Sequence, residues 1–456
     1  MNDSQHSVKP NALALIPFVV FAVFYVGMSL VADMHYHADM PFYAVPMPIA
    51  FLIASAAALF FGRKKTLTEK IDVYAAGMGE TNIMIMCLVF ILAGAFATVA
   101  KQMGAVDAAV KLCQTVMPPG LMVAGLFVIA CLISVSIGTS CGTIAALTPI
   151  AVGLIEKMGL DPALAIGSVV GGAMFGDNLS MISDTTIAAT RTQNIAMRDK
   201  FVANFRIVLP AAILAIVLYA LLGFSGNAAD GAVPAAAASP IVLKDFVLVL
   251  PYLLVLGLAF TGMNVMLLLF LGTVLAAVVG NVYGAFNFLE GLQLVGQGAM
   301  GMSETLIVAL LAGGLLGLIR HNGGVAWLIG LIERTIGSVR GCEFGVAALV
   351  AAVNLFTANN TVAIVIAGPI AKNLSDRFGC RPARIASILD TTSCVIQGII
   401  PYGAQLLIAT SLAKNAGCPV DVFAVIGHLY YVWLLAVAVI VAIVATGRKR
   451  TAAPTA

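Results

Sequence analysis

Long apolar runs alternate with short polar stretches along nearly the whole chain. Many of these runs reach about 20 residues, the length that a helix needs to cross the hydrocarbon core of a bilayer. The first run, at 12–32, is too long for the core of a signal peptide and lacks a small-residue cleavage site, so we expect it to be the first span. The pattern therefore predicts an all-α polytopic membrane protein with about 12–14 membrane segments.

Two apolar stretches in the first half have polar centres. The stretch 120–157 is far too long for one straight span and carries a cluster of Gly, Ser and Thr at 138–143. The stretch 162–195 carries acids, an amide and hydroxyls at 176–186, among residues that form helices poorly. Irregular backbone at membrane depth is tolerated only where it is buried in protein or lines a cavity. We therefore predict interrupted helices or re-entrant hairpins at both places.

The second half of the chain repeats these features at a nearly constant distance. Short matches lie 218–220 residues apart: 101–104 with 320–323, 138–143 with 356–361, 148–150 with 368–370, and 161–163 with 381–383. Several matches in register are hard to obtain by chance, so the chain contains two copies of one unit. The polar centre of the second copy lies at 390–405.

Basic residues indicate that the two copies face opposite ways. The segment 372–384 is rich in Lys and Arg, which favours the cytoplasm, whereas the equivalent turn of the first copy, at 156–157, falls outside in the same count. Arg334 and Arg340 fit this orientation poorly. Inverted repeats with interrupted helices at matching places indicate a secondary transporter whose site lies near the membrane midplane.

Charge and composition also predict the organisation of the chain. Basic clusters at 63–65 and 448–450 place both termini in the cytoplasm of a multi-pass bacterial inner-membrane protein, and further basic residues mark a cytoplasmic end near 191–206: Arg191, Arg198, Lys200 and Arg206. The Ala/Pro/Gly-rich stretch 225–240 predicts an external linker. We expect an N-terminal two-helix segment at 1–74, a first transporter repeat at 75–223, the linker with connecting helices at 224–300, and a second repeat at 301–456.

Composition excludes several classes of protein. The chain is 61% hydrophobic and 10% charged, and its net charge of +3 is spread over short loops without a polybasic tail, so nucleic-acid binding is not expected. No phosphate-binding Walker loop and no enzymatic constellation occurs, so we expect neither an enzyme nor an ATP-driven pump, and no cofactor or metal site. A channel would be expected to show rings of pore-lining polar residues, and the sequence has no such pattern.

Three acids expected at membrane depth are the candidates for coupling. Asp177 and Asp184 lie in the first polar centre, and Asp390 opens the second. An ionised acid in hydrocarbon costs several kcal/mol, so each must face protein or a water-filled cavity. The structural alternatives are a cap on a helix half or a pair with Arg191 for the first two, and an N-cap for Asp390. The functional hypothesis is that a carboxylate binds either a proton or Na⁺.

Hydroxyl and amide side chains in the same places are candidate ligands for the ion or substrate. They are Asn178, Ser180, Ser183 and Thr185 in the first centre, Thr139, Ser140, Thr143, Asn359, Asn360 and Thr361 at the two hairpin tips, and Thr391 and Gln397 in the second centre. Helix-half termini and free carbonyls could bind Na⁺ or an anionic group there. The alternative role is hydrogen bonding between helices, which is common for such residues in membranes.

The segment 176–186, with 138–143 upstream, resembles the NhaC family of sodium/proton antiporters within the ion-transporter superfamily. The likeness extends from about residue 75 to the end. It is greatest to the shorter branch of predicted permeases in this family, whose motif the segment 183–193 resembles. Two positions depart from the better-studied members: Cys141 stands where they have tryptophan, and Pro401-Tyr-Gly403 replaces a Pro-Trp-Asn motif.

This resemblance implies a scaffold domain plus a transport domain, a homodimer in the lipid bilayer, and exchange of Na⁺ for H⁺. Some members of the wider group exchange carboxylates or take up amino acids. The alternative function is therefore Na⁺- or H⁺-coupled transport of an amino acid or a small carboxylate by the same fold, with a small organic solute as a second partner besides the cation.

Overall fold

A computed structural model describes residues 9–36, 45–60, 66–181, 183–229, 242–259, 261 and 263–446. The basic cluster 63–65, most of the predicted linker 225–240 and the basic end 448–450 lie outside these residues. Every regular element of the described residues is a helix. By length and composition, 9 of these helices could cross a membrane, and two further apolar helices are shorter, Met47–Phe60 and Tyr430–Ala445. The predicted all-α polytopic fold is confirmed.

The helices of the first half are η2 (Ala12–Leu15), α1 (Ile16–Tyr36), α3 (Met47–Phe60), α4 (Leu67–Met78), α5 (Thr81–Gln102), α6 (Ala105–Val116), η3 (Pro119–Leu121), α7 (Met122–Ile137), α8 (Ser140–Met158), α9 (Pro162–Leu179), α10 (Asp184–Gln193) and α11 (Met197–Ala229). Those of the second half are α12 (Leu243–Ala259), α13 (Val265–Val282), α14 (Phe288–Gly301), α15 (Ser303–His321), α16 (Gly324–Thr335), α17 (Val339–Thr357), α18 (Asn360–Phe378), α19 (Pro382–Ile399), α20 (Ala404–Asn415), α21 (Val422–Gly427) and α22 (Tyr430–Thr446).

Both copies are interrupted at the predicted places. Gly138 ends α7 with a φ of 76°, and Ala358 ends α17 with a φ of 45°. This left-handed backbone turns the chain sharply, so α8 runs back beside α7 and α18 back beside α17. The long stretch 162–195 also breaks, between α9 and α10, as the sequence predicts.

The correspondence between the halves includes helices before residue 75. The order α1, α3, α4, α5 recurs as α12, α13, α14, α15. The two sets pack crosswise, with α4 on α15 and α14 on α5. Gly77 lies against the carbonyl of Gly313 and Gly94 against that of Gly298, so that a Cβ at either place would collide with backbone. Glycine is required there because two helices approach this closely.

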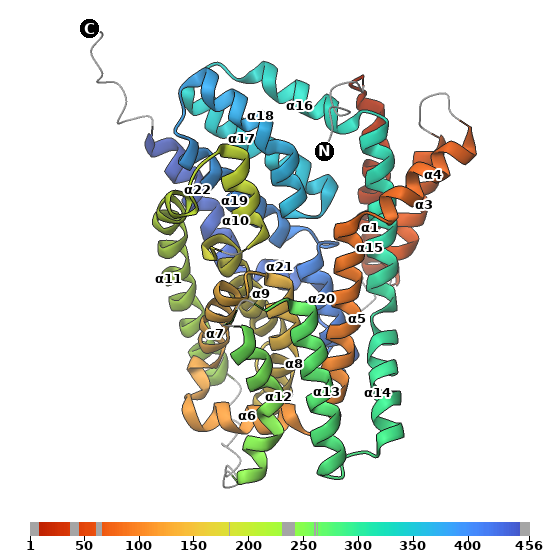
Figure 1. The fold of residues 1–456 in the computed structure, drawn as a ribbon, viewed down its shortest axis with the longest axis vertical. Coiled ribbons are helices and arrows are strands. Elements are labelled where there is room, and N and C mark those ends of the chain that lie inside the picture. Colours follow the sequence, from red (N-terminus) through yellow and green to blue (C-terminus); the bar gives the residue numbers. More distant parts are fainter. Residues whose placement is uncertain are drawn as a thin grey trace.

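Two groups of helices stand side by side in Figure 1. One contains α1, α3, α4, α5, α13, α14 and α15, and the other contains α7, α9, α10, α11, α17, α18, α19 and α22. Between the groups, α8 contacts α5, and α20 contacts α5 and α15. Helices α8 and α20 therefore lie in the interior of the bundle, between the two groups.

The short helices α6 and α16 lie at opposite ends of the molecule (Figure 1). Each follows a glycine in the left-handed region, Gly104 and Gly323, as expected for elements related by inversion. Arg384 donates a hydrogen bond of 3.4 Å to Glu343. The start of α17, which carries Arg340, thus lies at the same end as the basic turn 377–384. Helix α16, which carries Arg334, is drawn at that end in Figure 1.

Candidate functional site

Hydroxyl side chains at the break between α9 and α10 form hydrogen bonds with the backbone carbonyls that the break exposes. A helix end leaves its last carbonyls without intrahelical partners. Ser183 Oγ and Thr185 Oγ1 donate to the carbonyl of Asp177 at 3.0 and 3.1 Å, and Thr186 Oγ1 donates to that of Ser180 at 2.7 Å. Ser183 also accepts from the amide of Thr186 at the start of α10. The polar residues that weaken the helix here therefore also satisfy the backbone that the break exposes.

The Asp177 carboxylate lies at the N-terminus of α8. Its Oδ1 accepts from the amide of Ser140 at 3.0 Å, and its Oδ2 accepts from the hydroxyl of Ser140 at 2.5 Å. Ser140 is the first residue of α8, because Gly138 ends α7 just before it. The N-terminus of a helix carries a partial positive charge, which favours an anion. Asp177 is only 5% exposed, so this interaction takes place away from bulk water.

Gln397 occupies the position in the second copy that Asp177 has in the first, since 177 plus 220 is 397. Its Nε2 donates to the carbonyl of Ala358 at 3.0 Å and to Oε1 of Gln405 at 2.8 Å. Gln405 Nε2 in turn donates to Ser140 Oγ at 2.9 Å. A chain of hydrogen bonds thus joins the tip of the second hairpin to the tip of the first, and both polar centres meet in one place.

One polar atom beside this chain, Oε1 of Gln397, is buried and has no hydrogen-bond partner among the described residues. The Asn360 side chain lies near the Asp177 carboxylate. A buried polar atom that makes no hydrogen bond within the protein is costly, and its lone pairs are available to a ligand. Asp177 and Ser140 therefore offer a carboxylate and a hydroxyl to a small ion, and Gln397 carries an unused amide oxygen in the same hydrogen-bonded chain.

A buried ion pair between α11 and α19 lies next to the break between α9 and α10. Lys200 Nζ is 2.9 Å from Asp390 Oδ2, and the two side chains are 1% and 0% exposed. The same ammonium donates to the carbonyl of Asn178 at 2.9 Å and to Thr186 Oγ1 at 2.6 Å. Asn204 Nδ2 donates to Asp390 Oδ2 at 2.6 Å and to the Asn178 carbonyl at 2.8 Å. These contacts join α9, α10, α11 and α19.

The position of Lys200 corrects the sequence analysis, which placed it among the residues of a cytoplasmic end. It lies in the first turn of α11, and Asn204 is one turn further on the same face. That face packs against α19 and α9. Lys200 and Asn204 lie four residues apart at the start of a long apolar helix. This spacing was the sequence signal that one face of the helix is polar and points into the protein. Asp390 lies inside α19, so the N-cap alternative is wrong.

Asp184 has surroundings unlike those of Asp177. It is exposed, as is Arg191, and it forms no ion pair within the described residues. It occupies the first turn of α10, where a carboxylate suits the helix dipole. The break places the two acids on different helices, Asp177 near the end of α9 and Asp184 at the start of α10, and no contact joins their side chains among the described residues.

Several other sequence candidates bond to nearby backbone. Asn178 Nδ2 donates to the Met174 carbonyl and the Tyr431 hydroxyl, both at 3.0 Å, and Ser180 lies within the break, 1% exposed. Four others bond to the backbone of their own helix or its first turn: Thr143 Oγ1 donates to the Thr139 carbonyl at 3.1 Å, Asn359 and Asn360 accept from the amides of Val362 and Thr361 at 3.0 Å, and Thr391 Oγ1 donates to the Ser387 carbonyl at 2.7 Å. Thr139 and Thr361 are partly exposed at the two hairpin tips.

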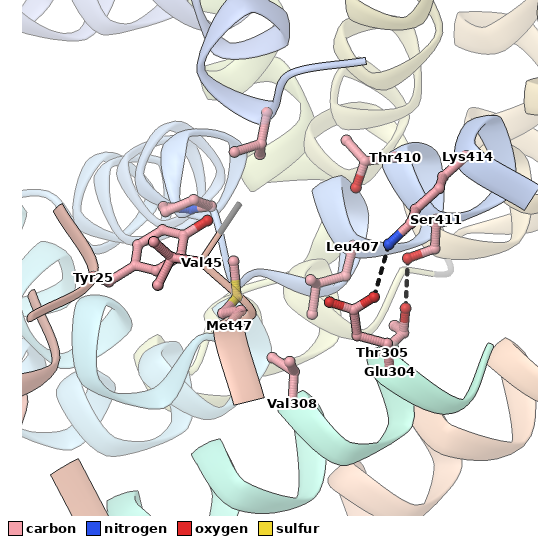
Figure 2. Close-up of a pocket in the computed structure, with 12 residues that line it drawn as sticks. Tyr25, Val45, Met47, Glu304, Thr305, Val308, Leu407, Thr410, Ser411 and Lys414 are labelled. Carbon is pink, nitrogen blue, oxygen red and sulfur yellow. Dashed lines mark hydrogen bonds and ion pairs between the residues drawn. The ribbon is translucent and has the colours of Figure 1, made fainter. Parts of the chain in front are cut away.

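A cavity of about 60 Å³ lies between α15 and α20, and its lining along α20 runs from Pro401, just before the helix, to Lys414 in its last turn. Figure 2 shows its polar wall, where Lys414 forms an ion pair with Glu304 at 2.9 Å and Thr305 bonds Ser411 at 2.5 Å. Apolar side chains complete the lining, among them Tyr25, Met47, Val308 and Leu407. Sequence analysis did not single out these residues, because they come from helices that are far apart along the chain.

Helix breaks that meet inside a membrane bundle, with a carboxylate at the end of a helix half, define the class of secondary transporters. Comparison with known proteins agrees with this class. Residues 13–224 and 232–448 match the Na⁺/H⁺ antiporter family. The chain therefore belongs to the Na⁺/H⁺ antiporter family, whose members are secondary transporters and not enzymes.

Individual relatives cover most of the chain at low identity. The Na(+)/H(+) antiporter NhaC of Bacillus subtilis is 25% identical over 92% of this chain and 94% of its own. The malate-2H(+)/Na(+)-lactate antiporter of the same organism is 21% identical over 94% and 93%. The arginine/ornithine antiporter ArcD of Halobacterium salinarum is 25% identical over 70% and 69%. Among solved structures, the Alcanivorax borkumensis YdaH transporter aligns over 97% of this chain and 100% of its own, with 16% identity and a TM-score of 0.42.

Proposed function

We propose that this protein exchanges Na⁺ for H⁺ across the bacterial inner membrane and that Asp177 is the carboxylate at which the two ions compete. The observation that carries the proposal is the buried carboxylate at the N-terminus of α8, joined to the second hairpin tip through Gln405 and Gln397. The NhaC relative named as a Na(+)/H(+) antiporter gives independent support.

The chemistry of the site suits competition between the two ions. Na⁺ prefers hard oxygen ligands, and Asp177, Ser140 Oγ and Gln397 Oε1 are such ligands. A proton on the carboxylate removes the charge that attracts Na⁺, so one occupant excludes the other. Burial makes the charged carboxylate without a cation costly, so the site favours crossing the membrane with either ion bound.

Ion flux in proteoliposomes with an internal pH dye tests the proposal. Added Na⁺ should change the internal pH, with Li⁺ and K⁺ as comparisons. Asp177→Asn should reduce the response by at least about a hundredfold, because an ionic ligand is worth roughly 3 kcal/mol. The matched control is Asp184→Asn, in which an exposed acid is neutralised and the response should stay within about threefold, since exposed charges interact weakly. Wild-type exchange by the Asp177→Asn protein would overturn the assignment.

A second candidate function is coupled transport of an amino acid or a small carboxylate. The cavity between α15 and α20 favours it, because Glu304 and Lys414 could hold the ammonium and carboxylate of one solute, with Thr305 and Ser411 as hydroxyl partners. The relatives that exchange malate and lactate, or arginine and ornithine, point the same way.

Uptake of labelled amino acids and carboxylates into the same vesicles tests this candidate. Saturable uptake driven by Na⁺ or H⁺ that Lys414→Met abolishes would support it, while Thr115→Val, which alters an exposed hydroxyl bonded to its own helix, serves as the control. A pH response to Na⁺ alone, with no uptake across the panel, would leave only cation exchange.

The proposed arrangement in the membrane has both termini in the cytoplasm and two chains in a homodimer. Its support is that the first described residues and the end of α22 lie at the same end of the molecule, together with the basic segment 372–384 (Figure 1). Labelling of single cysteines at 9 and 377 from either side of sealed vesicles should give the same sidedness for both. Crosslinking in native membranes measures the number of chains.

A further inference from the structure

The ammonium of Lys200 lies within a shell of oxygen atoms. An ammonium has three N–H donors, and the structure provides three acceptors: Asp390 Oδ2, the Asn178 carbonyl and Thr186 Oγ1, at 2.9, 2.9 and 2.6 Å. With the Lys200 side chain 1% exposed, bulk water does not serve as a partner. The Asn178 carbonyl belongs to the C-terminal end of α9, which carries partial negative charge.

These acceptors are also the ligands that a hard monovalent cation uses. A carboxylate, a backbone carbonyl and a hydroxyl are typical of oxygen sites for hard cations, and half-helix C-terminal ends coordinate such ions in transporters. Two residues of this shell carry a further oxygen, since Asp390 Oδ1 and Asn204 Oδ1 are buried without a hydrogen-bond partner among the described residues. A purely structural lysine clamp gives no reason for this excess of acceptors.

We propose that the oxygen shell around Lys200 Nζ is a second cation site, which the protein fills with its own tethered ammonium. The charge of Asp390 is then balanced permanently from within the chain, and Asp177 is left as the carboxylate that must take its cation from solution. Removing the ammonium opens the shell to Na⁺ or another alkali ion. This inference concerns a different set of ligands from the proposed exchange at Asp177 and does not depend on it.

The test uses purified full-length protein whose first site has been silenced by Asp177→Asn. Lys200→Met in this background removes the ammonium and keeps most of the side-chain volume. Melting temperatures are measured in NaCl, KCl and choline chloride at equal ionic strength. We expect the Asp177→Asn protein to melt at the same temperature in all three. The Asp177→Asn/Lys200→Met protein should melt lower in choline and recover by about 3 °C at a Na⁺ concentration about a hundredfold above its Kd, because a ligand that binds only the folded state stabilises it.

A third variant identifies the ligand. Adding Asp390→Asn to the Asp177→Asn/Lys200→Met protein should remove the Na⁺-dependent recovery and raise the melting temperature in choline, since no uncompensated buried charge remains. If Lys200→Met protein is recovered only when Na⁺ is present throughout purification, that result also supports the proposal. Equal melting of the Asp177→Asn/Lys200→Met protein in Na⁺ and choline, or its aggregation in both, would overturn it and leave Lys200 as a structural clamp.

Discussion

The two hairpin tips that meet at the centre of the molecule share one backbone and differ in charge. Gly138 and Ala358 both adopt a left-handed conformation, and a helix starts two residues later in each case. The first tip presents the amide N–H of Ser140 to a carboxylate, Asp177. The second presents the carbonyl of Ala358 to an amide, Gln397. The fold is thus repeated while the chemistry is not, and at this position only the first half carries an acid.

Equivalent backbone contacts are made by different side chains in the two halves. Ser134 Oγ donates to the carbonyl of Ala173 at 2.6 Å, and Asn354 Nδ2 donates to that of Ser393 at 2.7 Å. Each pair ties the helix before a hairpin tip to the broken helix that follows it, at an offset of 220. A repeat can therefore keep its packing while its polar residues diverge, which leaves the site itself free to become asymmetric.

Moving the carboxylate from position 177 in the first half to position 397 in the second should have the largest effect on exchange. The double variant Asp177→Asn/Gln397→Glu keeps both side-chain shapes and the total charge. We expect exchange to stay at least about a hundredfold below wild type, because the carboxylate at 397 would face the Ala358 carbonyl without an N–H donor, and a buried anion needs donors. Flux in proteoliposomes measures it, with each single variant alongside. Recovery of exchange to within tenfold of wild type would mean that the two tips are equivalent.

Cutting the link between the tips should have an intermediate effect. Gln405→Leu removes the amide that joins Gln397 to Ser140. Loss of a hydrogen bond to a buried group costs about 1–3 kcal/mol, so the Na⁺ concentration for half-maximal response should rise roughly tenfold. Ser168→Ala is the control, because that buried hydroxyl bonds only its own helix. An unchanged Na⁺ dependence in Gln405→Leu would show that the tips act independently.

The smallest expected effect concerns the backbone of the two tips. Alanine in the left-handed region costs roughly 1 kcal/mol more than glycine. Ala358→Gly should therefore raise the melting temperature of the protein, and Gly138→Ala should lower it, each by about 1 °C in a chain of this length. Thermal unfolding in detergent measures both. Shifts of the same sign in the two variants would contradict the shared geometry of the tips.

How much of the site the sequence predicted depends on the kind of signal. The breaks at 138–143 and 176–186 were predicted because glycine and short polar residues oppose helix formation within an apolar run. The separation of Asp177 from Asp184 was not predicted, since the two acids give the same signal in sequence. Only the position of the break decides that the first is buried at α8 while the second is exposed.

The sequence by itself determined that the chain is a helical membrane protein made of two copies of one unit with interrupted helices. Hydrophobic length, helix-breaking residues and periodic matches are local properties, so no contact between distant residues is needed to find them. The tertiary structure decided which polar groups face one another. Gln405 reaches Ser140 across 265 residues of chain, and Lys200 reaches Asp390 across 190. Such partners follow from how α8, α11, α19 and α20 pack, which no local pattern in the sequence specifies.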